Sequence, residues 1–358
     1  MRAERMKVLH IVPNAPINEF VRQDARYLKN LKGIESEFYS INLLNQDKVG
    51  LDLVALAYSV IKSIQVRLRN FDVLHCHFLP SSIMGVTSQT PIVVTTHESA
   101  DTYTSLWKAF FRFSLRKCSI INVSRYNREY WMRRVGFAGE VVYHAVDCEI
   151  YNPKRRSRIL HEKISSRLGT DRWLLTMGAL DKARGHEVLL NALAKLRNKG
   201  VHLGLVIKGY GGNPVYIRNF IHMINRSDVP TLLIRNHLPE ESLAILMASC
   251  DAFVRPSFQE SFGIAPLEAQ ACGVPVLANK CCSLSEVFRD SALFFRADNP
   301  IDLQDKINHL LCDEEIRLSI IERGLRNASE LSWERKLDAY VEIYNKTIQA
   351  KQSETKHI

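Results

Sequence analysis

The chain of 358 residues contains no apolar run that approaches the ~20 residues of a membrane-spanning helix. Its start, MRAERMKVLHIVPNAP, passes from a few charges directly into a strand-like run, so we expect no signal peptide. The eight cysteines show no CxxC spacing. The absence of CxxC spacing argues against a zinc site or a disulfide framework, and it predicts reduced thiols in a cytosolic protein.

Several ligand-binding motifs are also missing. The sequence has no GxxxxGK[ST] segment and no Asp-x-Asp pair, so neither a P-loop nor an obvious set of metal ligands is present. The glycines of IKGYGGNP (207–214) fall short of GxGxxG because Pro214 stands at the last position. We interpret this stretch as a strand-to-helix loop, with direct ligand contact as the alternative.

The net charge of +10 is distributed unevenly. Residues 1–165 contain 24 Lys and Arg against 15 Asp and Glu, a net +9, and the remainder contains 24 against 23, a net +1. The difference predicts two domains, the first of which meets an anionic surface or acceptor. We do not expect nucleic acid as a partner, because no known binding module accompanies the charge.

Apolar strands alternate with amphipathic helices twice along the chain, which predicts two doubly wound α/β domains with parallel sheets, facing each other across a cleft. The polar, aperiodic segment 151–171 is the expected linker. The predicted domains are 1–160 and 161–335, and residues 336–358 form a helix that packs back toward the first. Three further expectations are a strand at 7–13, a helix at 51–70 and a strand at 140–146.

Open parallel sheets bind ligands beyond the carboxyl ends of their strands. His97 follows the strand-like PIVVTT, and Glu260 follows DAFVRPS. We therefore expect both side chains at edges that face the cleft.

The stretch ESFGIAPLEA, Glu260 to Ala269, places two acids eight residues apart. Gly263 and Pro266 predict that a short helix begins at Pro266, which leaves Glu260 in a loop and Glu268 at the third helical position. A helix-capping role is the structural alternative for Glu268, although Ala265 cannot complete a capping box. We favour a binding role for both acids, because a carboxylate accepts hydrogen bonds from the two hydroxyls of a diol.

The stretch MGALDKARG places Lys182 and Arg184 between a strand end and a helix start. Two cations beside helix N-terminal amides suit a diphosphate. Solvated surface charges are the simpler explanation of this stretch taken alone.

The segment RPSFQESFGIAPLEAQACGVPVLA (255–278) resembles the Glu-x7-Glu signature of retaining glycosyltransferases of family 4. MGALDKARG, LVIKGYGGNP, TTHES, YHAVDCEIYNP and LSWERKLDAY agree with the family in order and spacing. The resemblance covers nearly the whole chain. It implies the GT-B fold, with the acceptor on the first domain and a nucleotide-sugar donor on the second.

The resemblance also implies site residues. Glu260 would hold donor-sugar hydroxyls and Glu268 the ribose hydroxyls, while Arg184 stands where the family has a diphosphate-binding lysine. His97 matches the histidine that approaches the donor sugar, for which packing at a strand end is the alternative. The remaining expected donor contacts are Gly178, Lys182 and the backbone amides of Phe262, Gly263 and Ile264.

The chain departs from the family at several positions. Ala179 replaces an arginine, which puts one phosphate contact in doubt, and Glu98 replaces a glycine after the histidine. The first loop lacks the usual glycines, which leaves Asn14 and Arg22 as weaker candidates on the acceptor side.

The expected activity is the transfer of a sugar from a UDP- or GDP-sugar to an acceptor hydroxyl, with retention of configuration and without a metal or other cofactor. The acceptor would be lipid-linked or a polysaccharide, in glycan, polysaccharide or glycolipid synthesis. The alternatives are a nucleotide-sugar isomerase of the 2-epimerase type and an inactive sugar-binding or scaffold protein.

The segment LWKAFFRFSLRKC (106–118) places Lys108, Arg112 and Arg116 on one helical stripe among aromatic residues. Such a helix can lie at an anionic membrane surface. A mostly buried helix with one solvated stripe is the simpler alternative. We expect a cytoplasmic protein that associates peripherally with the inner face of the membrane.

Overall fold

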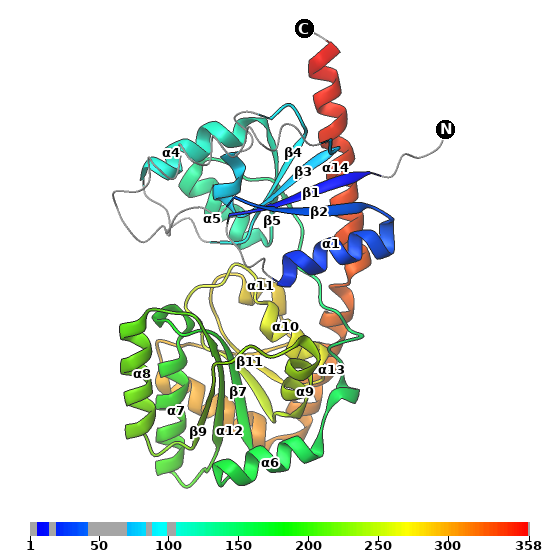
Figure 1. Cartoon of the computed structure of the whole chain (residues 1–358). Coiled ribbons are helices and arrows are strands. Elements are labelled where there is room, and N and C mark those ends of the chain that lie inside the picture. Colours follow the sequence, from blue (N-terminus) through cyan, green and yellow to red (C-terminus); the bar gives the residue numbers. More distant parts are fainter. Residues whose placement is uncertain (1–5, 14–18, 42–69, 84–87, 99–104, 357–358) are drawn as a thin grey trace. The chain divides into compact units, whose positions relative to one another are not determined.

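The computed structural model describes residues 6–13, 19–41, 70–83, 88–98 and 105–356 (Figure 1). The chain divides into two compact units. The first unit combines Met1–His144 with Trp333–Ile358, and the second is Ala145–Ser332. Of the helix predicted at 51–70, residues 51–69 lie outside the described residues. Within the described part of the chain, no helix combines the length and the apolar character needed to cross a membrane.

The first unit is built on a six-stranded sheet in which all neighbouring strands are parallel, in the order β2-β1-β3-β4-β5-β6. Its central strands β3 and β4 are wholly buried. The sequence of β4 is β-branched throughout, whereas β3 also buries two histidines, His75 and His77. The strands are β1 (Lys7–Val12), β2 (Glu35–Ser40), β3 (Val73–His77), β4 (Ile92–Thr96), β5 (Cys118–Asn122) and β6 (Glu140–Val141).

The strand predicted at 140–146 is wrong beyond Val141. Val142 still donates to the carbonyl of Asn122, but the amide of Val146 already pairs with Leu331 in the second unit. The chain leaves the edge of the first sheet here, so its backbone partners change. The described α-helices of the first unit are α1 (Glu19–Lys32), α4 (Ser105–Ser114), α5 (Arg125–Val135) and α14 (Trp333–Lys356).

Helix α14 closes the first unit, where it packs on α1 and β4 (Figure 1). Lys336 forms a buried ion pair with Asp24 of α1, and the Trp333 ring stacks on Tyr27 at 4.4 Å. A buried charge needs such a partner, because an unpaired one would carry a large desolvation cost. The amphipathic C-terminal helix is therefore part of the first unit's core.

The expected boundary at residue 160 falls inside α6 (Arg158–Leu168), a helix of the second unit. The supposed linker 151–171 is likewise part of that unit, because Tyr151, Ile164 and Leu168 are all buried in it. The segment is polar because most of its other side chains face solvent, and a few buried residues attach it to the unit.

The second unit contains another six-stranded parallel sheet, in the order β12-β11-β10-β7-β8-β9. The strands are β7 (Trp173–Ala179), β8 (Gly204–Tyr210), β9 (Thr231–Ile234), β10 (Ala252–Arg255), β11 (Val276–Asn279) and β12 (Leu293–Phe295). The other helices are α7 (His186–Asn198), α8 (Pro214–Arg226), α9 (Glu240–Ser249), α10 (Ile264–Ala271), α11 (Leu284–Phe288), α12 (Pro300–Cys312) and α13 (Glu314–Glu330).

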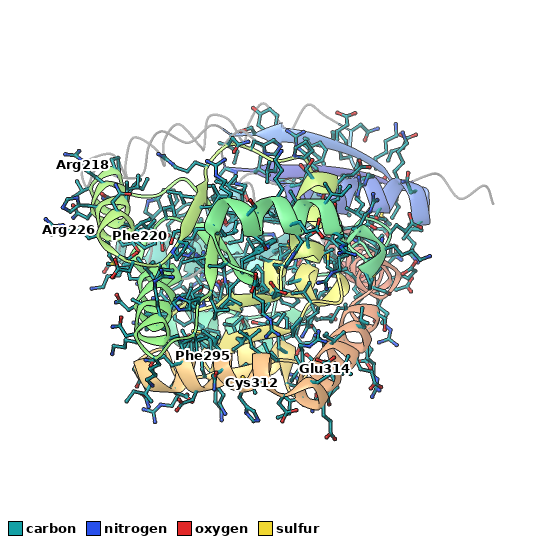
Figure 2. All side chains as sticks on the ribbon, turned by 90° about the horizontal axis from the view of Figure 1, so that it is seen from below. Arg218, Phe220, Arg226, Phe295, Cys312 and Glu314 are labelled. Carbon is teal, nitrogen blue, oxygen red and sulfur yellow. The ribbon has the colours of Figure 1, made fainter. Side chains whose placement is uncertain are left out.

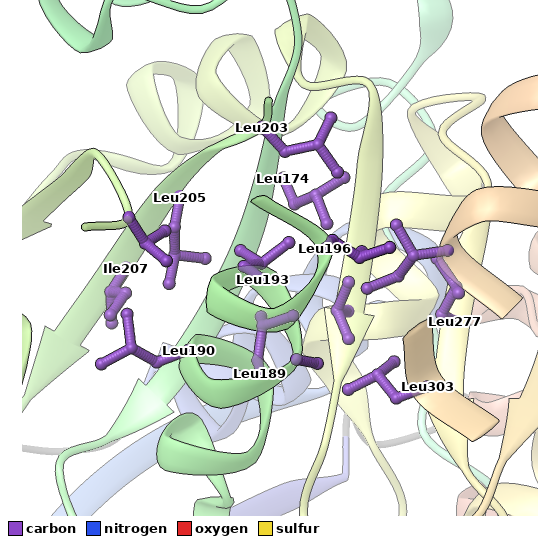
Figure 3. Close-up of a cluster of buried hydrophobic side chains, with 14 of the residues drawn as sticks. Leu174, Leu189, Leu190, Leu193, Leu196, Leu203, Leu205, Ile207, Leu277 and Leu303 are labelled. Atoms are coloured by element: carbon purple, nitrogen blue, oxygen red, sulfur yellow. The ribbon is translucent and has the colours of Figure 1, made fainter. Parts of the chain in front are cut away.

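Leucines of α7 form the centre of the core in this unit, where they meet residues of β7, β8 and α12 (Figure 3). Helix α8 shows the same amphipathic rule at the surface: Phe220 points to the core, whereas Arg218 and Arg226 are exposed (Figure 2). The helix thus buries one face and exposes the other.

The order of the strands reverses between β1 and β3 in the first sheet and between β7 and β10 in the second. At such a switch point the connections leave in opposite directions and open a crevice at the carboxyl ends of the strands. The two switch points are therefore the places to look for ligand-binding residues.

Candidate functional site

The switch point of the second sheet carries a cluster of three charged side chains, two of which are buried. Arg255 ends β10, and Glu260 lies in the loop that follows it; their side chains are 7% and 8% exposed. Oε1 of Glu260 accepts a hydrogen bond from Nε of Arg255 at 2.6 Å and another from Nη1 of Arg184 at 2.7 Å. Arg184, predicted as a site residue, thus meets Glu260, and Arg255 joins them.

Gly178 leaves the space that this cluster occupies. Its backbone φ is +154°, and a Cβ atom there would lie 2.9 Å from Nη1 of Arg255 and 3.6 Å from Cδ of Arg184. Arg255 also donates to the carbonyl of Met177, which ties the end of β7 to β10. A side chain at position 178 would therefore displace the guanidinium group of Arg255, whereas Arg184 is at an ordinary contact distance.

The cluster is charged and electropositive. Burial by itself would raise the pKa of Glu260, but the charges of Arg255 and Arg184 outweigh burial and hold this pKa below its ordinary value. Two guanidinium groups and one carboxylate leave a net charge of +1. Such a cluster suits a phosphate-containing anion, which arginine binds through paired hydrogen bonds.

The turn that presents Arg184 is built by its neighbours. The side chain of Asp181 accepts a hydrogen bond from the amide of Arg184 at 3.1 Å. Gly185 adopts φ +67°, and a Cβ atom there would lie 2.2 Å from the carbonyl oxygen of Pro256. The turn therefore packs directly on the chain after β10, and it leaves Lys182 exposed.

Helix α10 begins at Ile264 with Gly263 as its N-cap at φ +102°, so the predicted start at Pro266 is wrong. Pro266 is tolerated at the third helical position, two positions further on than expected, because the first-turn amides of a helix have no intrahelical acceptor. Glu268 consequently lies beyond the first turn, where a capping role no longer applies. Phe262, just before this helix, is buried, and Ile264 is partly exposed.

Glu268 differs from Glu260 in its surroundings. Burial and the nearby charge of Glu240 raise the pKa of Glu268 to about 7, against the opposing effect of a hydrogen bond from Tyr151. Glu260 is thus ionised at neutral pH, whereas Glu268 is close to half protonated. The two acids of the signature are tuned to different states.

His97 belongs to the first unit and directly follows β4. Its Nε2 lies 3.1 Å from Nδ1 of His77, at the end of β3. The rings of Phe20, Phe78 and His144 lie around it, with centroids 4.7, 4.9 and 5.3 Å away. Contacts on several sides hold the imidazole in one orientation.

Glu98 has a structural role that a glycine could not perform. Its carboxylate accepts hydrogen bonds from the amides of Leu79 at 2.6 Å and His97 at 2.9 Å. Its backbone oxygen accepts one from Nε1 of Trp131 at 3.2 Å. Glu98 thereby links the segment after β3 to the segment after β4, and this link positions His97.

The acceptor-side candidates are less well placed. Asn14 lies outside the described residues. Arg22 is exposed on α1 and, with Arg26, lines a hollow of about 390 Å³. Two arginines one helical turn apart can attract an anionic group.

Sequence reasoning missed Arg255, Tyr151 and three histidines of the first sheet, His10, His75 and His77. Arg255 could have been found, because an arginine in the apolar strand DAFVR is buried and needs a partner. Two of the histidines, His75 and His77, alternate with other residues in VLHCH, so they share one face of that strand. No local pattern marks Tyr151.

Two family models match the chain. Residues 33–150 match the model described as Glycosyltransferase Family 4, and residues 158–326 match Glycosyl transferases group 1. The chain belongs to the family 4 glycosyltransferases. It is 27% identical over 307 residues to an uncharacterized glycosyltransferase of Methanocaldococcus jannaschii, a match that covers 82% of this chain and 81% of that protein.

This glycosyltransferase also resembles enzymes that carry a specific name and proteins of solved structure. It is 28% identical over 234 residues to the D-inositol 3-phosphate glycosyltransferase of Nocardiopsis dassonvillei, across 62% of this chain and 53% of that enzyme. Among solved structures, a glycosyltransferase from Rickettsia africae has a TM-score of 0.77 at 16% identity and covers 96% of this chain and 99% of that one. HepE of Anabaena with UDP and glucose has a TM-score of 0.71 at 17% identity, with 98% and 100% covered. The fold is GT-B, as the resemblance implied, and the chain is a transferase.

Proposed function

We propose that this glycosyltransferase uses a nucleoside-diphosphate sugar as donor and transfers the sugar to an acceptor hydroxyl with retention of configuration. The observation that carries the proposal is the cluster of Arg184, Arg255 and Glu260 around Gly178 at the switch point of the second sheet. It combines cations for a diphosphate with a carboxylate for hydroxyl groups. UDP, which HepE holds in its solved structure, is one nucleotide of this class.

The leaving group is a nucleoside diphosphate, whose negative charge must be stabilised as the glycosidic bond breaks. We assign this role to Arg184 and Arg255, with Lys182 at the exposed side of the same turn. Arg255 also offers a replacement for the family arginine that is Ala179 here. Because the sequence has no Asp-x-Asp pair, we propose that these cations act without a metal ion, and that transfer continues in EDTA.

The hydrogen bonds from both arginines reach Oε1 of Glu260. We assign Oε2 to a hydroxyl of the donor sugar, together with backbone amides of Phe262, Gly263 and Ile264. Glu268 accepts the ribose hydroxyls. A carboxylate that two guanidinium groups hold is a poor nucleophile, which favours attack of the acceptor on the same face of the sugar, with the departing diphosphate taking its proton.

The acceptor we propose is an anionic, lipid-linked sugar or polyol. The relatives include enzymes named for D-inositol 3-phosphate, a phosphorylated polyol. Arg22 and Arg26 offer exposed positive charge on α1. The first unit also exposes Arg112, Arg116 and Phe113, the last to 59%, on and just after α4, which suits an anionic membrane surface.

Thermal-shift measurements against UDP, GDP, ADP and their sugars test the donor class. We expect one base to raise the melting temperature, and the sugar nucleotide of that base to serve as donor for a product whose anomeric configuration NMR can determine. Absence of a shift with every nucleotide contradicts the proposal. Conversion of the donor without an acceptor would instead indicate an isomerase, and binding without any turnover an inactive sugar-binding protein.

A further inference from the structure

A chain of histidines runs across the switch point of the first sheet. Nδ1 of His10, on β1, lies 2.9 Å from Nε2 of His77, on β3. Nδ1 of His77 in turn lies 3.1 Å from Nε2 of His97. The parallel register sets this arrangement: His10 is opposite His75, and His77 is on the same face two residues further along. Three imidazoles are thus joined end to end by two N···N hydrogen bonds.

All three rings are neutral at physiological pH. Burial, followed by the positive charge of Lys336, lowers the pKa of His10 to about 3. Burial also lowers the pKa of His97 and of His77 well below the ordinary value, with further contributions from neighbouring imidazoles for His77 and from Lys336 for both. Each ring therefore carries one proton, on either Nδ1 or Nε2.

Neutral rings joined in this way have only two arrangements of their protons. Each N···N bond needs one hydrogen, and the third proton must then lie at one end of the chain. It lies either on Nδ1 of His97, with every ring an Nδ1–H tautomer, or on Nε2 of His10, with every ring an Nε2–H tautomer. The tautomer of His97 is therefore coupled to that of His10, two rings away.

The two ends of the chain are not equivalent. Nε2 of His10 and Nδ1 of His97 are both buried atoms, and neither has a hydrogen-bond partner among the described residues. His10 is 0% exposed, whereas His97 stands at a strand end and is partly exposed. An orphaned N–H in a fully buried position is rare because it loses its bond to water without replacement. An N–H on His97 lies in the ring that reaches the strand end, where the acceptor oxygen of a bound ligand can pair with it, whereas an N–H on Nε2 of His10 would stay unpaired inside the sheet.

We propose that His10 and His77 are positioning residues that fix His97 as the Nδ1–H tautomer. His97 then presents a neutral, pre-oriented hydrogen-bond donor at the carboxyl edge of the first sheet. A matching ligand offers an acceptor oxygen there. Its identification as a hydroxyl oxygen of the donor sugar rests on the proposed function, whereas the tautomer does not.

Metal binding is the competing use of these side chains. Ligand nitrogens of His10, His75 and His77 lie within 4.8 Å of one another. Two nitrogens bound to one tetrahedral zinc ion at ~2.0–2.1 Å would lie about 3.4 Å apart, but those of His10 and His77 lie 2.9 Å apart. Both nitrogens of His75 already pair, with Tyr344 and Thr95, at 2.7 Å. The geometry favours hydrogen bonds.

The test uses the full chain labelled with ¹⁵N-histidine. Long-range ¹H–¹⁵N correlation spectra distinguish a protonated ring nitrogen from an unprotonated one. We expect His10, His77 and His97 to be Nδ1–H tautomers at both pH 6 and pH 8. A charged ring, or an Nε2–H tautomer at His97, overturns the proposal. So does one equivalent of zinc that binds and shifts the signals of His10 and His77.

Two matched substitutions test the coupling. His10→Phe removes the first ring of the chain, and we expect His97 to lose its single tautomer. His75→Phe removes an equally buried imidazole from the same sheet that is outside the chain, and we expect His97 to keep its tautomer. Identical spectra of His97 in both variants overturn the coupling. If His10→Phe does not fold, the wild-type spectra alone still decide the tautomer.

Turnover provides the second measurement. Once donor and acceptor are known, we expect His10→Phe to lower kcat/KM about tenfold, the usual effect of one misaligned hydrogen bond, and His75→Phe to leave it near wild type after correction for the folded fraction. Equal losses in both variants mean that the chain only stabilises the fold, and this overturns the positioning role. If no nucleotide sugar is ever turned over while the tautomers are as expected, the proposed function fails and the fixed tautomer of His97 stands.

Discussion

The polar side chains at the switch points of the two units differ in ionisation: those of the second unit are charged, and those of the first are neutral. The second unit holds charged groups, Arg184, Arg255 and an ionised Glu260, in mutual contact. The first unit holds neutral imidazoles linked by hydrogen bonds, with His97 at the strand end. Both are built on the same kind of parallel sheet, so the fold does not dictate the difference.

The difference shows two ways in which a protein offsets the desolvation cost of a buried polar side chain. A buried guanidinium cannot lose its proton, so it must keep a carboxylate or take up a phosphate. A buried imidazole gives up its charge and keeps hydrogen bonds. The charged cluster is therefore suited to an anionic diphosphate, and the neutral chain to an uncharged hydroxyl group. Substitutions that remove a charge should therefore change ligand binding and turnover more in the second unit than in the first.

The largest effect is expected for Glu260→Gln. This change removes the negative charge between two arginines and a hydrogen bond to a charged group, worth roughly 1.5–3 kcal/mol, so transfer should fall by about one to two decades. Steady-state rates measure it, and melting curves show how much variant is folded. Glu241→Gln, at an exposed position on α9, is the control and should behave as wild type. A folded Glu260→Gln enzyme with wild-type turnover would refute the assignment.

Arg184→Ala should weaken nucleotide binding by roughly ten- to thirty-fold, because it removes a charge-assisted contact to the diphosphate. Isothermal titration with the nucleoside diphosphate and with the nucleoside alone separates the contributions. The loss should appear with the diphosphate and not with the nucleoside. Lys182→Ala is the matched comparison and should have a smaller effect, since Lys182 is exposed. Unchanged diphosphate affinity in Arg184→Ala contradicts the role of this cation.

Glu268 should make donor binding depend on pH. With a pKa of about 7, the carboxyl group ionises as pH rises from 6 to 8 and becomes able to accept both ribose hydroxyls. Affinity for the nucleotide sugar should rise by up to about tenfold over this range. Titration calorimetry at several pH values measures it, and Glu268→Gln should remove the dependence. If the affinity of the wild-type protein does not change with pH, Glu268 does not titrate near pH 7 in the surroundings that Tyr151 and Glu240 provide.

The raised pKa of Glu268 should also make the stability of the folded protein depend on pH. The pKa of Glu268 is raised above its ordinary value of 4.5, so the folded protein binds more protons than the unfolded chain between these values. Its contribution to stability is present below pH 4.5 and is lost as pH rises through about 7. Glu268→Gln should therefore gain up to about 2–3 kcal/mol relative to wild type between pH 5 and pH 8 in denaturant titrations. An equal difference at both pH values excludes the shift.

The smallest effect concerns the surface of the first unit. Each cation near an anionic membrane contributes about 1 kcal/mol, so binding to phosphatidylglycerol vesicles should be weak and should disappear at high salt. Neutralising Lys108, Arg112 and Arg116 together should abolish sedimentation with the vesicles, and Phe113→Ser should weaken it without changing the charge. Vesicle binding that does not change with these substitutions or with the salt concentration would indicate a soluble acceptor.

The sequence by itself determined the two α/β units, because alternating apolar strands and amphipathic helices leave few other ways to bury so many side chains. It also placed Glu260 in a loop after a strand, and Gly263 does separate that loop from helix α10. The domain boundaries were harder to predict: a few buried residues, Tyr151 among them, attach a polar segment to the second unit, and polarity alone could not reveal this.

Tertiary structure alone decided which side chains meet. Arg255 and Arg184 are 71 positions apart in the chain, yet both reach Oε1 of Glu260 because β7 and β10 are neighbours at the switch point. The histidines of β1 and β3 align through strand register, and no local pattern encodes that register. Protonation followed the same logic: Glu260 and Glu268 are identical residues eight positions apart, and only their neighbours after folding make one ionised and the other close to half protonated.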